Sequence, residues 1–168
     1  MAKELIKVGN EVTLASINAE PDLVAFDKVL IGASIRHGKH NPALYSYIES
    51  HQVELASREN AFFAVSLVAR KPTKNTPNTN PYMQAFMQQT TWRPQKLAVF
   101  AGRLNYPDYD FIDRNAIRFI MWLTKGPTDI NVDTEFTDWN KVTDFITDFN
   151  DSSQNQKAGE TIEDGKVS

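Results

Sequence analysis

The sequence predicts an α/β fold in which a parallel sheet is covered by helices on both faces. Three short apolar runs, at 27–35, 61–69 and 96–104, have the continuous hydrophobic character of strands buried on both sides. Segments with helical periodicity separate these runs, and such alternation favours parallel strands joined by crossover helices. The chain has 168 residues, 41% of them hydrophobic, which suits one domain with one substantial core.

The chain is expected to open with a helix and a strand. Residues 2–8 are typical of the end of a helix that stops at Gly9 and Asn10, and residues 11–17 are strand-like. The buried run at 27–35 follows as the next strand. We therefore expect two strands before the first polar loop.

A second helix is predicted directly after that loop. Asn41-Pro42 is a helix-start signal, since asparagine caps a first turn and proline is tolerated within it. We expect this helix to run to about residue 55. Its predicted inward-facing residues are Leu44, Tyr47, Ile48 and Val53.

The alternation continues after the strand at 61–69. A polar loop with three prolines at 70–81 leads into a predicted helix at 82–92. The strand at 96–104 then leads into a predicted helix at 110–126. Both helices fit the crossover pattern of a parallel sheet.

The last predicted helix is amphipathic and covers 138–149, capped by Thr137 or Asp138. From residue 151 onward the chain has almost nothing to bury. We therefore predict one domain at 1–150 and a disordered acidic tail at 151–168.

Composition excludes several kinds of site. The chain has no cysteine, which rules out disulfides, thiolate metal ligands and cysteine nucleophiles, and its three histidines make no convincing metal set. No apolar run reaches the ~20 residues that span a bilayer. The basic residues are interrupted by apolar strands, which argues against a nucleic-acid partner. Residues 1–126 have a net charge of +4 and residues 127–168 a net charge of −7. The positive charge of the first part either favours anionic ligands or is ordinary surface charge.

The loop after the strand at 27–35 is small, polar and basic. In parallel sheets ligands bind beyond the carboxyl ends of the strands, and this loop would lie there. Its glycines would let a flat ligand approach the backbone, and Arg36 would bring positive charge. A plain turn that needs glycine for its geometry explains the same residues, and both interpretations stay open.

Four ordered segments together resemble a known family. They are "IGASIRHG" (31–38), "SLVARKPTKNTPNTNPY" (66–82), "TWRPQKLAVFAGRLNYPDYDFIDRNAIRFIM" (91–121) and "TDW" (137–139). They are similar to the flavodoxin-like, menaquinone-dependent protoporphyrinogen dehydrogenases of bacterial haem synthesis, over about residues 3–150.

That resemblance implies an FMN cofactor and the six-electron oxidation of protoporphyrinogen IX to protoporphyrin IX. It implies a quinone, menaquinone or ubiquinone, as electron acceptor. It also implies peripheral attachment to the cytoplasmic face of the bacterial inner membrane, where the protein could form a homo-oligomer.

The chain departs from the family at its start. Family members begin with a short apolar strand and a loop that wraps the FMN phosphate, whereas residue 1 falls inside the helix that follows. We therefore expect the first, central strand to be missing, leaving the segments at 11–17 and 27–35 roughly two strand spacings of about 4.8 Å apart. Either the true start lies upstream, or the chain is a shortened paralogue that binds FMN weakly or not at all.

The resemblance also implies the residues around the flavin, which follow three successive strands. These predicted cofactor-binding residues are Ser34, Ile35, Arg36, His37, Gly38, Ser66, Leu67, Val68, Ala69, Gly102, Arg103, Leu104, Asn105 and Tyr106. Tyr106 either stacks on the flavin ring or packs within its loop.

The substrate has two propionates, which guanidinium groups match well. Its predicted partners are Arg36, Arg70 and Arg103, although Arg70 could equally be a solvated loop charge. His37 and His40 are either proton shuttles or solvated loop residues.

The helix at 110–126 ends in the apolar run 119–123, which covers more than one helix face. We expect exposed members among Phe119, Met121 and Trp122 to hold substrate or to dock on the membrane interface.

The sequence leaves two other functions open: an electron carrier of flavodoxin type, and a remnant that binds no cofactor. The long basic loop and the apolar helix argue against the carrier.

Overall fold

The structure is a computed structural model that describes residues 1–105, 115, 121–122, 129 and 133–163. Its centre is a three-stranded parallel sheet in the order β1-β2-β3. The strands are β1 (Lys28–Ser34), β2 (Glu59–Val65) and β3 (Lys96–Phe100). This sheet confirms the predicted parallel α/β architecture.

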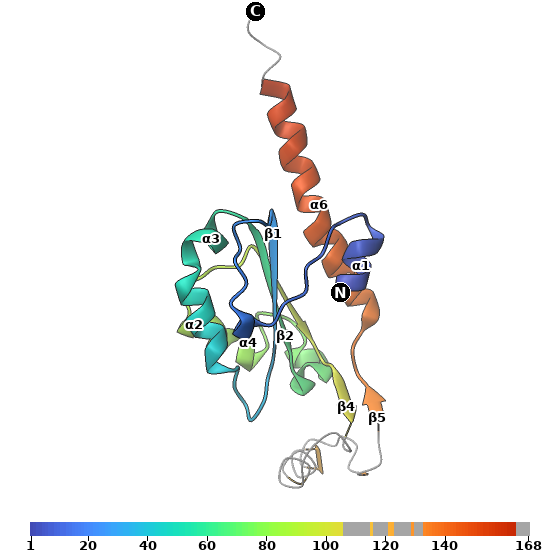
Figure 1. The fold of residues 1–168 in the computed structure, drawn as a ribbon. Helices are drawn as coiled ribbons and strands as arrows, with labels where there is room; N and C mark the ends of the chain where they lie inside the picture. The colour runs from blue at the N-terminus through green and yellow to red at the C-terminus, as the bar shows by residue number, and fades with distance from the viewer. Residues whose placement is uncertain (106–114, 116–120, 123–128, 130–132, 164–168) are drawn as a thin grey trace, which may run out of the picture.

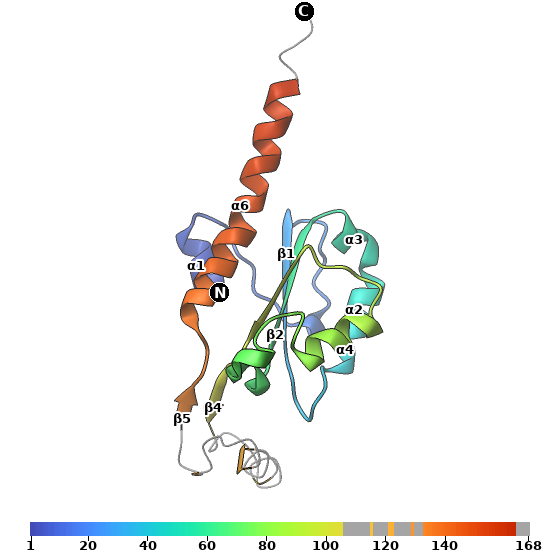
Figure 2. The same ribbon diagram turned by 180° about the vertical axis from the view of Figure 1, so that it is seen from behind.

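Helices cover both faces of the sheet, as the sequence predicts (Figures 1 and 2). One face carries α2 (Pro42–Ser50), α3 (Gln52–Ala56) and α4 (Pro81–Gln89). The other face carries α1 (Ala2–Lys7) and α6 (Trp139–Glu163), which contact each other.

Alternate residues of each strand point to opposite faces, so the sheet has two apolar cores. Phe62 of β2 belongs to the core under α2 and α4, where it stacks on Phe86 with ring centroids 4.1 Å apart and planes 17° apart. Phe63 lies against the core on the other face, which Val142 and Ile146 of α6 complete. Burial on both faces explains why the strands read as continuous apolar runs.

Side-chain caps start three of the helices; the caps at Asn41 and Asp138 are predicted from the sequence, whereas Asn80 was assigned to the polar loop at 70–81. Asn41, Asn80 and Asp138 each accept backbone N–H groups of the first turn, of α2, α4 and α6 respectively. Asp138 is thus the cap of the last helix, rather than Thr137. Each cap satisfies donors that have no partner within their own helix.

The predicted strand at 11–17 is wrong. These residues are irregular and lead into a short 3₁₀ helix, η1 (Ile17–Ala19). The backbone N–H of Asn18 in this helix donates to Ser16 Oγ. A strand needs a neighbour for its backbone hydrogen bonds. Among the described strands, β1 pairs with β2 alone, so the segment at 11–17 has no strand beside it.

The predicted helix from Pro42 to about residue 55 is interrupted. α2 ends at Ser50, His51 leaves helical geometry, and α3 restarts the helix in a different direction. Leu44, Tyr47 and Ile48 are buried as predicted, but Val53 is 79% exposed. The spacing of inward-facing residues in α2 therefore does not carry over into α3, because the chain changes direction at His51.

Two predicted strands are shorter than their apolar runs. β2 ends at Val65, and the following residues form the 3₁₀ helix η2 (Leu67–Arg70). β3 ends at Phe100, after which the chain bends at Gly102 and forms β4 (Arg103–Asn105). β4 pairs antiparallel with β5 (Asp133–Glu135) in a separate two-stranded sheet.

The tail prediction differs from the structure over residues 151–163. These residues continue α6 as a helix to Glu163, and this helix projects away from the sheet (Figure 1). Extending an existing helix costs far less than starting one, and residues 151–158 contain neither glycine nor proline. Residues 164–168 and most of the predicted helix at 110–126 lie outside the described residues, although 115, 121 and 122 are helical.

Candidate functional site

The structure brings together the three segments that the sequence places beyond the strands. The parallel strands end at one edge of the sheet, and hydrogen bonds join their ends directly. The backbone N–H of Ile35 donates to the Val65 carbonyl at 2.9 Å, and that of Ser66 donates to the Phe100 carbonyl at 2.8 Å. The residues that follow β1, β2 and β3 therefore share one end of the sheet, where ligands of such folds bind.

The segment after β1 is a tight hairpin. Arg36 and Lys39 exchange both backbone N–H···O=C bonds, at 3.0 and 3.1 Å, and form an antiparallel bridge. The two residues between them, His37 and Gly38, have φ angles of 50° and 75°. Positive φ at both central positions defines the turn that matches the twist of paired strands. Gly38 thus serves the turn geometry, and Arg36, His37 and Lys39 are carried at its exposed tip.

His40 anchors the base of the hairpin inside the core. Its ring is only 3% exposed and lies edge-on to Phe62 and Phe86, with centroid distances of 5.7 and 5.6 Å. Neither ring nitrogen has a hydrogen-bond partner among the described residues. Burial lowers the pKa of His40 to about 4, so the ring is neutral at neutral pH. His40 is thus neither a solvated loop residue nor an accessible proton shuttle.

The segment after β2 is a small, partly buried turn. Ser66 and Ala69 are buried, while Leu67 and Val68 are half-buried. Arg70 donates from its guanidinium to the Leu67 carbonyl at 3.1 Å, which draws this side chain back over its own 3₁₀ helix. The predicted roles of these residues toward flavin or substrate stay predictions.

The segment after β3 turns at Gly102, which has a φ of 77° and donates its N–H to Thr137 Oγ1 at 3.1 Å. A Cβ there would lie 2.6 Å from the Val65 side chain. Arg103 forms a two-pronged ion pair with Asp133 of β5, and this hydrogen bonding lowers the pKa of the Asp133 carboxyl. Arg103 therefore already has a carboxylate partner within the chain.

Leu104 and Met121 are fully buried and form a small core of their own with partly buried neighbours. Met121 is thus a core residue rather than an exposed one, whereas Trp122 is 67% exposed. Asn105 lies in β4. Tyr106 and Phe119, two further residues that the sequence singles out, lie outside the described residues.

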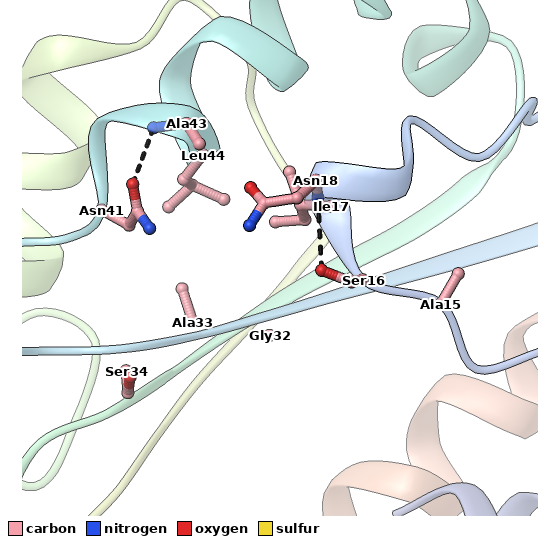
Figure 3. Close-up of a pocket in the computed structure, with 10 residues that line it drawn as sticks. All are labelled: Ala15, Ser16, Ile17, Asn18, Gly32, Ala33, Ser34, Asn41, Ala43 and Leu44. Carbon is pink, nitrogen blue, oxygen red and sulfur yellow. Dashed lines mark hydrogen bonds between the residues drawn. The ribbon is translucent and has the colours of Figure 1, made fainter.

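A pocket of about 290 Å³ lies beside the carboxyl end of β1, between the 15–18 segment and the start of α2 (Figure 3). Figure 3 shows the side-chain amides of Asn18 and Asn41 turned toward the same space. Its full lining is Ala15, Ser16, Ile17, Asn18, Gly32, Ala33, Ser34, Asn41, Ala43 and Leu44. The sequence singled out Ser34 as a site residue and Asn41 only as a helix cap. For the other lining residues, the local signal in the sequence is the pair Ser16 and Asn18, because serine and asparagine side chains favour turns.

The pocket lining fits the uncharged parts of a flavin nucleotide. Hydroxyl and amide groups can bond a polyol chain, and the small side chain of Ala33 leaves room beside the strand. None of the ten lining residues is charged. A phosphate group would therefore depend on residues outside this lining.

The described residues contain no group of three or more His, Cys, Asp or Glu side chains that could hold a metal ion. No helix among them is long and apolar enough to cross a membrane.

Residues 1–131 match the model of a flavodoxin domain family. The chain is 41% identical over 147 residues to the protoporphyrinogen IX dehydrogenase [quinone] of Escherichia coli strain K12, a match that covers 86% of this chain and 81% of that protein. It is 45% identical over 144 residues to the protein of the same name from Leishmania major, covering 86% of this chain and 58% of that one. No solved structure matches the chain.

Proposed function

Because the chain belongs to the flavodoxin domain family, and within it to the quinone-dependent protoporphyrinogen IX dehydrogenases, we propose that it oxidises protoporphyrinogen IX with FMN as cofactor and a quinone as electron acceptor. The chain is an oxidoreductase, and its flavodoxin domain implies a flavin. The identity of 41% over 147 residues is the observation that carries the proposal.

The proposed reaction removes six hydrogen atoms from the porphyrinogen in three two-electron steps. Each step reduces one quinone to the quinol, so three quinones are consumed for each protoporphyrin IX formed. FMN, when bound, would supply the two-electron acceptor that links the two substrates. The product is a porphyrin, which fits a role in haem biosynthesis, and the quinone would be menaquinone or ubiquinone.

The chain's own residues would hold and orient these molecules at the carboxyl edge of the sheet. The polar pocket beside β1 would bind the polyol chain of FMN through Ser34, Asn18 and Asn41. Backbone of the turns at 66–69 and 102–104 would lie against the flavin ring. Buried residues in both turns, including Ser66 and Leu104, hold that backbone in place and exclude water from beneath it.

Attachment to a membrane surface is part of the proposal, since a quinone is lipid-soluble. Trp122 is 67% exposed and Trp139, at the start of α6, is 59% exposed. Tryptophan is the side chain best suited to a membrane–water interface, because it has an apolar body and one polar N–H. We propose that such residues dock the protein on the cytoplasmic face of the bacterial inner membrane, where it could also form a homo-oligomer.

The proposal is tested by reconstitution. The purified chain is titrated with FMN, bound flavin is measured from the visible spectrum, and the complex is mixed with protoporphyrinogen IX and a menaquinone analogue without oxygen. We expect porphyrin fluorescence to appear only when chain, FMN and quinone are all present. Bound flavin that is reduced and reoxidised without porphyrin formation would instead favour an electron carrier. A chain that binds no flavin would contradict the proposal for this chain.

A further inference from the structure

The hairpin after β1 carries two cations that have no acidic partner among the residues that the structure describes. Arg36 and Lys39 are both exposed, and neither forms a salt bridge with any residue that the structure describes. By contrast, four other cations, Lys7, Lys28, Lys96 and Arg103, are paired with carboxylates. The hairpin is therefore a local excess of positive charge at the candidate site.

The hairpin geometry directs the two cations to one side. Residues that exchange both backbone hydrogen bonds in an antiparallel pair lie directly opposite each other, with Cα atoms about 5.5 Å apart and side chains on the same face. Arg36 and Lys39 are such a pair. Like charges placed opposite each other destabilise a hairpin, and a bound anion would remove that cost.

The hairpin is also held rigidly at both ends. At its base, the N–H of Ile35 bonds the end of β2, and His40 is buried among aromatic rings of the core. At its tip, Gly38 faces Tyr82 of α4, with the ring about a van der Waals contact away from where a Cβ would stand. A non-glycine residue with positive φ, His37, adds local strain that the surrounding structure must support. The two cations are therefore preorganised rather than on a loose loop.

We propose that Arg36 and Lys39 form a clamp for a pair of neighbouring carboxylates, and that Lys39 is a specificity residue for the propionate edge of the porphyrin substrate. The planar guanidinium of Arg36 suits two-pronged binding of one carboxylate, and the ammonium of Lys39 supplies a point charge for the second. This assignment rests on the proposed function, since it takes the porphyrinogen as the substrate that carries the two carboxylates.

The test compares protoporphyrin IX, which is stable in air and has both carboxylates, with its dimethyl ester, which has neither. Dissociation constants are measured by fluorescence titration in the same detergent. Lys39→Gln is expected to weaken binding of the diacid by roughly three- to tenfold and to leave binding of the diester unchanged. Lys39→Arg should keep most of the diacid affinity. Lys3→Gln, an equal charge change on an exposed residue of α1, is the matched control and should change neither.

A second variant separates the clamp from a general charge effect. Gly38→Ala keeps every charge but places a side chain at a φ of 75°, where it is strained, and nothing crowds its Cβ closer than 4.0 Å. We expect it to weaken diacid binding while the fold, followed by circular dichroism, is kept. If Lys39→Gln weakens binding but Gly38→Ala does not, charge alone acts and the clamp geometry is overturned.

Other outcomes also decide the assignment. Equal diacid affinity in Lys39→Gln and Lys3→Gln would overturn the clamp while leaving the proposed function intact. Loss of FMN binding in Lys39→Gln with unchanged porphyrin binding would mean that the hairpin holds the cofactor phosphate, which overturns the substrate role. Wild-type protein that binds neither porphyrin would overturn both the clamp and the proposed substrate.

Discussion

The buried imidazole of His40 makes the stability of the fold depend on pH in a predictable direction. Burial lowers its pKa from 6.5 to about 4 in the folded protein. In the unfolded chain the ring is solvated and takes up a proton near pH 6.5. Protonation therefore favours the unfolded state, so His40's contribution to stability is fully present above about pH 6.5 and is lost as the pH falls toward 4.

The size of the effect follows from the two pKa values. A difference of about 2.5 pH units corresponds to about 3 kcal/mol of unfolding free energy across the whole window, at 1.36 kcal/mol per unit. Between pH 7.5 and pH 5 the expected loss is about 2 kcal/mol, because only part of the window is crossed. The nearest rings, Tyr45, Phe62 and Phe86, carry no charge that could hold the protonated form.

The perturbation is His40→Phe, which keeps an aromatic ring of similar shape and removes the titrating group. Unfolding free energies are measured by urea titration with circular dichroism from pH 5 to pH 8 for both proteins. The wild type should lose about 2 kcal/mol more than the variant between pH 7.5 and 5. His37→Asn is the control, since asparagine tolerates the positive φ of this turn position and should leave the wild-type pH dependence in place. Parallel curves for wild type and His40→Phe would refute the reasoning.

Three further predictions follow from single contacts. Asn80→Ala should lower the unfolding free energy by about 1–3 kcal/mol, because Asn80 is fully buried and bonds two N–H groups of α4 and the Lys74 carbonyl; an unchanged urea midpoint would contradict this. Gly102→Ala should lower the unfolding free energy, because its new Cβ would lie 2.6 Å from the Val65 side chain. Adding Val65→Ala should restore the part of the loss that comes from this clash and leave the part that comes from the positive φ; a double variant with no gain in stability would contradict the clash. Trp122→Ser should lower binding to anionic liposomes in a sedimentation assay without changing the melting temperature; full retention of binding would remove Trp122 from the proposed membrane surface.

The parts of the fold that the sequence predicts are those determined by local chemistry or by burial on both faces. The strands β1 and β3 follow from continuous apolar runs, and α2 follows from the Asn41-Pro42 start. The failures depend on partners far along the chain. Residues 11–17 have strand-like composition but no neighbouring strand among the described ones, and β4 depends on pairing with β5, about thirty residues later.

The same distinction between local causes and distant partners applies to the candidate site. The meeting of the three segments at one edge of the sheet could be predicted, because it follows from parallel pairing of the strands. The burial of His40 could not, because a histidine two residues after a glycine in a basic loop reads as solvated, and only the packing of Phe62 and Phe86 from other elements encloses it. The pocket lined by Ser16 and Asn18 was missed because Ser16 was assigned to a strand at 11–17 and Asn18 was given no role.

The three predicted carboxylate partners of the substrate differ in what binding would cost. A carboxylate that reaches Arg103 must displace Asp133, whose lowered pKa reflects a hydrogen-bonded ion pair already in place. One that reaches Arg70 competes with a hydrogen bond to the Leu67 carbonyl. At Arg36 the incoming anion displaces no acidic group among the described residues and relieves repulsion from Lys39 across the hairpin. Since binding depends on the difference between what is gained and what is given up, the hairpin is the favoured anion site of the three.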